Sequence, residues 1–261
     1  MSWFTRAFGS TIGKKVLAGL SGLALVGFLI GHLYGNLHIY KGAGALDEYA
    51  HHLHEIPGFP LIEIGLLAAF ALHIGLVINL TMSNRSAKAS RYAVKGSKTG
   101  GGAGSLASRT MALSGMTLLV FLVVHIVQLR MNRGIEGGVG NLMFDTLANP
   151  AISALYIAGS LTVAWHVYHG IQSAARSLGV NHENYTPLIV KGGAALAVVF
   201  AVGFASIPVA VMAGLPTDGL AVFASSDDHG DAHGDESHDD AHDEDTDDAA
   251  DDESASADET H

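Results

Sequence analysis

Four histidines lie inside long apolar stretches of the chain, at His32, His73, His125 and His166. An ionisable side chain inside a membrane helix is costly, so each is a functional candidate. A single such histidine is most simply a hydrogen-bonding group between helices. One histidine on each of four successive apolar stretches instead favours ligands, because neutral imidazole binds a metal without adding charge.

The residue types favour haem over other metal centres. The chain of 261 residues has no cysteine, which excludes a cysteine-ligated iron–sulfur cluster and covalent haem attachment within it. Zinc sites bring three or four ligands to one level, and the apolar stretches contain no such cluster. Two imidazoles from separate helices suit a low-spin haem that transfers electrons.

The histidines are carried by segments long enough to cross a bilayer, for which about 20 apolar helical residues are needed. Five stretches qualify: Val16–Ile39, Pro60–Met82, Thr110–Leu129, Ala151–Ala175 and Leu188–Ala213. The first is too long for a signal peptide and has no small-residue cleavage site after it. The expected fold is all-α and integral to the membrane, with five transmembrane helices, four of them bundling around two stacked haems.

Basic residues predict the orientation, since they gather on the cytoplasmic side. With the N-terminus inside, eleven basic residues lie on the inner side, and only Lys41, Arg130 and Arg133 lie outside. We therefore expect residues 1–15 to be a cytoplasmic segment and 16–213 a five-helix membrane domain. No internal repeat is expected beyond the spacing of the histidines.

Depth sorts the four histidines into two pairs. His32 and His125 lie roughly 24 and 22 Å from the inner ends of their stretches, at a rise of about 1.5 Å per residue. His73 and His166 each lie roughly 13 Å from the inner end. We therefore expect an outer pair, His32 with His125, and an inner pair, His73 with His166, each clamping one haem.

The remaining 214–261 segment is predicted to be a disordered tail on the outer side. Eighteen of the chain's 25 acidic residues and none of its 14 basic residues lie from Asp218 onward. From Ser225 on, it has almost no apolar content and cannot bury a core. A solvated tail is favoured over weak metal binding by its histidines, His229, His233, His238 and His242.

Polar groups near the helix ends are candidate partners of haem propionates: Arg109, Arg130, Arg176 and Ser173. The five glycines around His32 are consistent either with close approach of a macrocycle or with ordinary packing of small residues. His51, His52 and His54 are expected in an outer loop, solvated or along a proton exit. His169, three residues after His166, is the rival ligand for the inner pair.

The histidine-bearing segments resemble a known family. They read His32-Leu-Tyr-Gly-Asn36, Leu72-His73, Arg109-Thr-Met-Ala-Leu-Ser-Gly115 leading to Val124-His125, and His166-Val-Tyr-His-Gly170 with Gln172-Ser173 and Leu178-Gly179. Over roughly residues 8 to 213 the chain is similar to the membrane cytochrome b subunit of succinate dehydrogenases and fumarate reductases, in the single-subunit, five-helix, di-haem (b558) form.

This resemblance implies two b haems, with His32 and His125 as iron ligands of the outer haem and His73 and His166 as those of the inner one. It also implies a flavoprotein with FAD and an iron–sulfur subunit on the cytoplasmic face of the bacterial inner membrane. Electrons would pass between succinate, a tricarboxylic acid cycle substrate, or fumarate and a membrane quinone, usually menaquinone. The dicarboxylate chemistry would belong to the partner subunits.

One position departs from the family pattern. Some di-haem members carry a membrane carboxylate two residues before the fourth ligand, where this chain has Ala164. For proton exchange with quinone we expect instead Glu63, with Glu48 and Glu55 behind it. Two other functions stay open: a cytochrome b anchor of another dehydrogenase, and a metal transporter lined by histidines, which would usually show discontinuous helices and membrane carboxylates.

Overall fold

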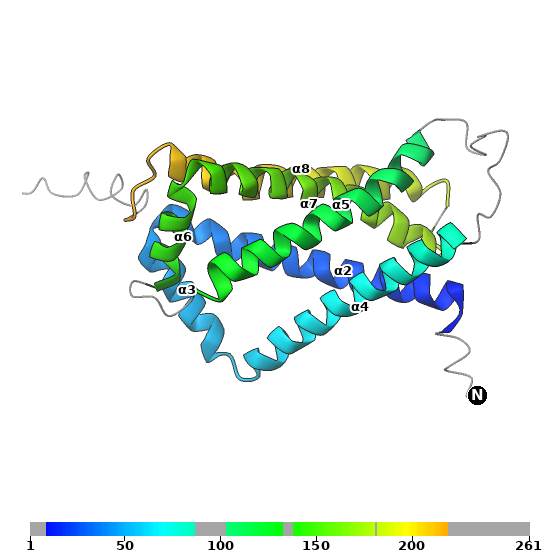
Figure 1. Cartoon of the computed structure of the whole chain (residues 1–261), viewed down its shortest axis with the longest axis horizontal. Coiled ribbons are helices and arrows are strands. Elements are labelled where there is room, and N and C mark those ends of the chain that lie inside the picture. The colour runs from blue at the N-terminus through cyan, green and yellow to red at the C-terminus, as the bar shows by residue number, and fades with distance from the viewer. Residues whose placement is uncertain (1–8, 87–102, 133–137, 181, 219–261) are drawn as a thin grey trace, which may run out of the picture. The chain divides into compact units, whose positions relative to one another are not determined.

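A computed structural model describes residues 9–86, 103–132, 138–180 and 182–218, with side chains left out at 85–86 and 103–109. In this part of the chain every regular element is helical (Figure 1). The elements are α2 (Thr11–Asn36), the 3-10 turn η1 (Leu37–Lys41), α3 (Ala43–Glu55), α4 (Phe59–Ser86), α5 (Ala103–His125), the π-helical turn η2 (Ile126–Arg130), α6 (Gly138–Ala148), α7 (Pro150–Ser177) and α8 (Thr186–Met212).

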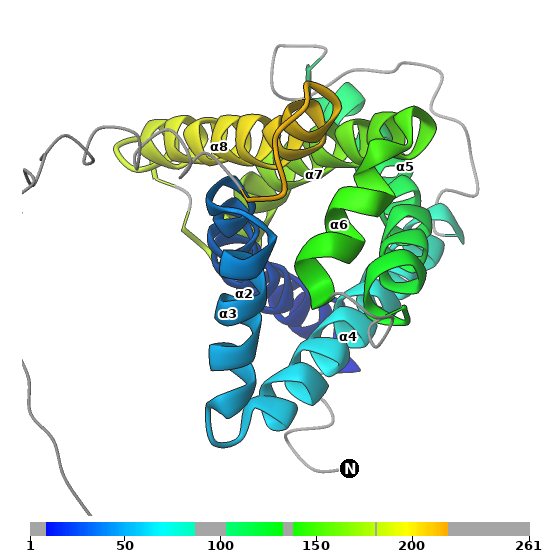
Figure 2. The ribbon, with the colours of Figure 1, turned by 90° about the vertical axis from the view of Figure 1, so that its left-hand side faces the viewer.

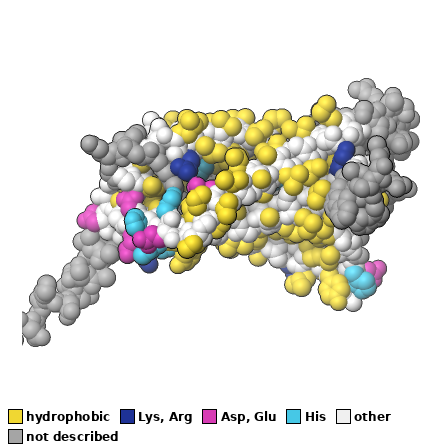
Figure 3. Space-filling view, turned by 90° about the horizontal axis from the view of Figure 1, so that it is seen from below, with side chains coloured by type: hydrophobic (Ala, Val, Ile, Leu, Met, Phe, Trp, Pro, Cys, Tyr) yellow, Lys and Arg dark blue, Asp and Glu magenta, His cyan; other side chains and the backbone are white. Residues whose placement is uncertain are grey.

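Five of these helices are long and apolar enough to cross a membrane, which confirms the five predicted stretches. The candidate spans are Thr11–Lys41, Phe59–Asn84, Thr110–Arg130, Pro150–Ser177 and Thr186–Met212. The first begins earlier than predicted because Ser10 caps it: its Oγ accepts a hydrogen bond of 3.0 Å from the backbone N–H of Gly13. Hydrophobic side chains cover much of the face seen in Figure 3, with charged groups mainly toward its ends.

The two short helices, α3 and α6, lie together at one end of the long helices, here called the α3/α6 end (Figures 1 and 2). The sequence pattern predicts a loop where α3 forms, and this is wrong. The helix forms because it buries an apolar face against α6 and the last turns of α8. The shared core comprises Ile39, Ala43, Leu46, Met143, Phe144, Leu147 and Ile207.

Two polar contacts tie the α3/α6 end together. Asp47 of α3 accepts, through Oδ1, a hydrogen bond of 2.9 Å from the backbone N–H of Gly140, in the first turn of α6. It thereby satisfies a donor that has no partner within its own helix. The backbone N–H of Ala43 bonds to the carbonyl oxygen of Thr217 at 2.6 Å. Residues just after α8 are thus held against the start of α3, although they belong to the predicted tail.

The long helices pack in a defined order. α7 packs along α8, α2 contacts both α4 and α7, and α5 contacts α7. Small residues allow close approach: a Cβ at Gly19 would lie 3.4 Å from Ala174, and one at Gly159 would meet the Phe121 ring. Leu33, Val167 and Phe200 form a core between α2, α7 and α8. Among α2, α4, α5 and α7, the contacts run in the order α4, α2, α7, α5, so the pairs α2/α5 and α4/α7, here called diagonal, do not pack directly on each other.

Residues 1–8, most of the loop 92–108 and the tail from 219 onward lie outside the described residues. The predictions made for them, including the tail's histidines, therefore stay predictions. The same holds for the side chain of Arg109.

The link between α3 and α6 predicts a stability effect. Asp47→Ala removes the acceptor from the Gly140 N–H, and we expect the free energy of unfolding to fall by about 1 kcal/mol. Asp47→Asn keeps an acceptor oxygen and should lose less. Thermal unfolding in detergent measures both variants. The exposed neighbouring change Glu48→Ala is the control, and an equal loss there would contradict the assignment.

Candidate functional site

The four membrane histidines come from four different helices, and each predicted pair spans a diagonal of the bundle. His32 lies on α2 and His125 ends α5, whereas His73 lies on α4 and His166 on α7. All four side chains are half-buried, so part of each ring is left uncovered by the protein. The histidines of each pair thus come from helices that do not pack directly on each other.

The two rings of the outer pair lie close together, with their planes nearly perpendicular. The ring centroids of His32 and His125 are 5.8 Å apart, with an angle of 89° between the ring planes. Metal–imidazole bonds are about 2.0 Å long, so two rings on opposite sides of one ion would have centroids about 6 Å apart. The separation of this pair therefore suits a single metal ion held between them.

Aromatic side chains orient the outer pair. Phe28 stacks on His32 with centroids 5.2 Å apart, and Phe121 stacks on His125 at 5.8 Å. Each phenylalanine lies four residues before its histidine, on the same helix face. Tyr156 of α7 lies 5.7 Å from the His125 ring. The His125 ring is thus held by packing, and its Nδ1 has no hydrogen-bond partner.

The inner pair is held by hydrogen bonds instead. The Nδ1 of His73 lies 3.1 Å from the Ala18 carbonyl oxygen and 3.3 Å from the Ser21 hydroxyl. A carbonyl can only accept, so His73 carries its proton on Nδ1, which leaves the Nε2 lone pair free as a metal ligand. A metal-binding histidine usually donates its other ring N–H in this way.

His166 has an equivalent partner in Ser114. Its Nδ1 lies 3.1 Å from the Ser114 Oγ, which itself donates to the Met111 carbonyl at 3.1 Å. Because that bond uses the hydroxyl proton, the serine oxygen accepts from the His166 N–H, and Nε2 is again free.

Glycine makes room for the inner rings. A Cβ on Gly22 would lie 3.0 Å from the Cε1 of His73, and one on Gly115 would lie 3.5 Å from that of His166. The first distance is tighter than ordinary contact, so a side chain at Gly22 would shift the His73 ring by a few tenths of an ångström. At the level of the inner pair, therefore, the glycine-rich face of α2 packs against the candidate ligand His73.

The two halves of the site repeat along the sequence, contrary to the expectation of no further repeat. Leu20-Ser21-Gly22, Phe28 and His32 recur 93 residues later as Leu113-Ser114-Gly115, Phe121 and His125, and Ala71 with His73 recurs as Ala164 with His166. Each ligand pair thus takes one histidine from each repeat. The serines were missed from the sequence, and this spacing is the signal that identifies them.

His169, the rival to His166, has different surroundings. Its ring packs against Trp165 at 4.6 Å and Tyr168 at 4.9 Å, and its Nε2 has no hydrogen-bond partner. It lacks the bond to a neighbouring helix that anchors His166. These contacts favour His166 as the ligand of the inner pair.

The predicted propionate partners have diverse surroundings. Arg130 of η2 pairs with Glu63 of α4, its Nη2 lying 3.2 and 3.3 Å from the two carboxylate oxygens. Arg176 lines a small pocket between α7 and α8 together with Gln172 and Thr186. Ser173 is exposed, whereas the next residue, Ala174, packs on α2. The Arg130–Glu63 ion pair therefore joins η2 to α4.

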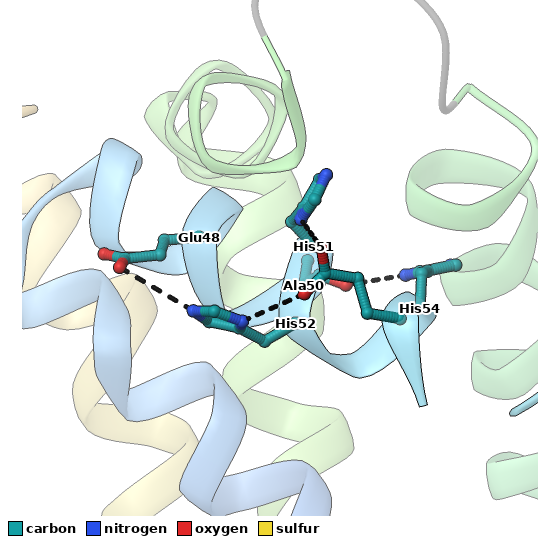
Figure 4. Close-up of polar contacts among 6 residues, drawn as sticks. Glu48, Ala50, His51, His52 and His54 are labelled. Atoms are coloured by element: carbon teal, nitrogen blue, oxygen red, sulfur yellow. Dashed lines mark hydrogen bonds and ion pairs between the residues drawn. The ribbon is translucent and has the colours of Figure 1, made fainter. Parts of the chain in front are cut away.

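The histidines of α3 form an exposed group with carboxylates (Figure 4). His52 lies 3.8 Å from Glu48 and 3.2 Å from Glu55, and His51 lies 3.5 Å from Glu55. His54 bonds to the carbonyl oxygen of Ala50 at 2.6 Å. They are exposed on a helix rather than in a loop, so the predicted exposure fits but the predicted loop does not.

The donor set fits a haem at each level. Each level offers two imidazoles from diagonal helices, and the inner two keep Nε2 free. No group of three or more His, Cys, Asp or Glu side chains suited to a metal ion occurs within the described ranges. A bare metal ion would therefore have only two protein ligands at each level. A porphyrin supplies four nitrogens of its own and needs only two axial ligands. Ala164, the position of the missing carboxylate, is buried and borders an apolar groove between α7 and α8.

Comparison with known proteins gives one informative match. No protein-family model matches the chain, and no solved structure matches it significantly. The chain is similar to the succinate dehydrogenase cytochrome b558 subunit of Bacillus subtilis (strain 168), with 26% identity over 169 residues that cover 63% of this chain and 78% of the relative. The resemblance predicted from the histidine-bearing segments is confirmed by this similarity to a succinate dehydrogenase cytochrome b558 subunit.

Proposed function

We propose that the chain is the membrane cytochrome b subunit of a succinate:quinone oxidoreductase, passing electrons between an iron–sulfur subunit and a membrane quinone. The observation that supports this is that each predicted pair takes its histidines from two helices that do not pack directly on each other, with the rings of the outer pair 5.8 Å apart. His32 and His125 would hold the outer b haem, and His73 and His166 the inner one. Each bis-histidine haem would supply one-electron transfer.

The partner subunits would carry the rest of the chemistry. The chain has no cysteine, so iron–sulfur clusters must be held elsewhere. We infer a flavoprotein with FAD and an iron–sulfur subunit on the cytoplasmic side of the bacterial membrane. The inner pair of histidines lies nearer that side and would receive electrons first. A subunit of this kind takes part in dicarboxylate oxidation without holding the dicarboxylate.

Polar groups near the outer pair support a quinone site there. The Tyr156 hydroxyl and the Gln128 Oε1 are both buried without a hydrogen-bond partner. Gln128 lies in η2, and π-helical turns are frequent at functional sites. A quinone carbonyl would accept from the Tyr156 hydroxyl, and a quinol hydroxyl would donate to Gln128. We infer menaquinone as the substrate, with Glu63 exchanging its protons.

Replacing the ligands predicts selective loss of haem. His73→Ala or His166→Ala should remove the inner haem, and His32→Ala or His125→Ala the outer one, because a haem with a single remaining axial histidine is held weakly. A reduced-minus-oxidised pyridine haemochrome spectrum of the purified protein should fall from about two haems per chain to about one.

His169→Ala is the matched control, since it removes a histidine of α7 one turn away. Two haems should remain in that variant. A His166→Ala protein that kept both haems at full occupancy would refute the assignment of His166. A folded, haem-supplied wild type without any haem would exclude the cytochrome reading and favour the metal transporter.

Glu63→Gln tests proton exchange. The ion pair with Arg130 is partly exposed, so its loss should cost less than about 1 kcal/mol of stability. If Glu63 exchanges protons, quinone reduction should slow several-fold while both haem spectra persist. Glu183→Gln, an exposed carboxylate between α7 and α8, should leave the rate unchanged. Equal rates in the two variants would remove Glu63 from the quinone site.

The orientation can be tested by cysteine labelling, because the wild type has no cysteine and gives no background. Gly9→Cys lies before α2, where a Cβ would meet no atom within 4 Å, and Glu48→Cys lies on exposed α3. A membrane-impermeant maleimide added to intact cells should label only the Glu48 position. Labelling of the Gly9 position alone would reverse the predicted orientation.

A further inference from the structure

We propose that Ser21 and Ser114 are positioning residues for the inner haem, orienting His73 and His166 through their Nδ1 atoms and thereby setting the reduction potential of that haem. This inference rests on the proposed function, because it assigns a role toward a haem held by these histidines. It goes further in naming two residues that act through the ligands rather than on the iron.

The hydrogen bonds have a defined direction. Ser21 Oγ donates to the Ala18 carbonyl at 3.2 Å, and Ser114 Oγ donates to the Met111 carbonyl at 3.1 Å. Each hydroxyl proton is therefore committed to the serine's own helix. The oxygen lone pairs remain for the imidazole N–H of the neighbouring helix, at 3.3 Å for His73 and 3.1 Å for His166. At His73 the Ala18 carbonyl fixes the tautomer and Ser21 adds a second contact, whereas at His166 Ser114 is the side chain that bonds to Nδ1.

The arrangement occurs twice, at equivalent positions. Both bonds join residues that are 52 positions apart, and the second lies 93 residues after the first. Four serines are buried among the described residues: Ser21, Ser114, Ser153 and Ser160. Ser153 and Ser160 bond to backbone carbonyls, as helical serines commonly do. Burial of a serine in this bundle therefore does not by itself bring its hydroxyl against a membrane histidine.

An acceptor on the imidazole N–H affects the metal. It makes the ligand more basic, which stabilises the oxidised iron relative to the reduced iron and lowers the reduction potential. Removing the acceptor should therefore raise the potential. The two ligands differ in one respect: His73 also donates to the Ala18 carbonyl at 3.1 Å, a bond that no side-chain substitution removes. Loss of Ser114 should accordingly have the larger effect.

The experiment is a redox titration of the purified haem-loaded protein, followed in the visible spectrum and by electron paramagnetic resonance. In Ser114→Ala, we expect the inner haem to show up to a tenfold shift in its oxidised-to-reduced ratio at a fixed potential, where tenfold is about 59 mV for one electron. Ser21→Ala should shift it in the same direction by less. The outer haem should titrate as in the wild type.

Ser160→Ala is the matched control, because this buried serine of α7 bonds only to the Tyr156 carbonyl, at 2.7 Å. It should leave both potentials unchanged. Ser114→Thr keeps a hydroxyl and should restore the wild-type potential. A change in the low-spin resonance signal of Ser114→Ala would report rotation of the ligand ring, which a purely structural role would not produce in a normally folded protein.

Unchanged potential and resonance in Ser114→Ala would overturn the proposal while leaving the haem assignment intact. If Ser114→Ala instead lost the inner haem, retention of that haem by Ser114→Thr would support the role of the hydroxyl. Loss in both variants would assign Ser114 to packing and overturn the proposal. A wild type without haem would refute the proposed function itself, which distinguishes the two failures.

Discussion

Polar groups inside a membrane must find their partners within the protein, because hydrocarbon offers none. The described helices meet this constraint in their backbones, and the histidines make it acute, since each imidazole brings two polar nitrogens to membrane depth. At the inner level one nitrogen of each ring is satisfied by a serine, helped at His73 by the Ala18 carbonyl. The other nitrogen is left with a free lone pair, which a metal can use. The same hydrogen bonds therefore satisfy a polar nitrogen inside the membrane and orient each ring as a ligand.

The outer level meets the constraint differently. Its rings are held by aromatic stacking from Phe28 and Phe121, and buried polar atoms of His125, Gln128 and Tyr156 have no protein partner. Such atoms are costly to bury unless something polar reaches them. These three atoms lie near the α3/α6 end of the helices, where the proposed quinone would meet them.

The 93-residue repeat explains why the site has this form. Helices α2 and α4 correspond to α5 and α7, and the short helices α3 and α6 occupy corresponding places between them. Each ligand pair takes the same position from both repeats, so each haem would be held in nearly equal surroundings on its two sides. The two repeats differ in two contacts. His73 has an additional bond to the Ala18 carbonyl, and Glu63 pairs with Arg130.

The sequence by itself determined the five spans, the depth of each histidine and the family resemblance. It could do so because bilayer thickness imposes span length and helical rise converts residue number into depth. It also contained the repeat, although the motif around Ser21 and Ser114 was not recognised there. Only the tertiary structure decided which residues face the histidines, that Glu63 meets Arg130, and that α3 is a helix. Helices as uniformly apolar as α4 and α5 carry no periodic signal of which face points inward. Their rotation, and so their side-chain partners, is decided by packing against neighbours distant in the chain.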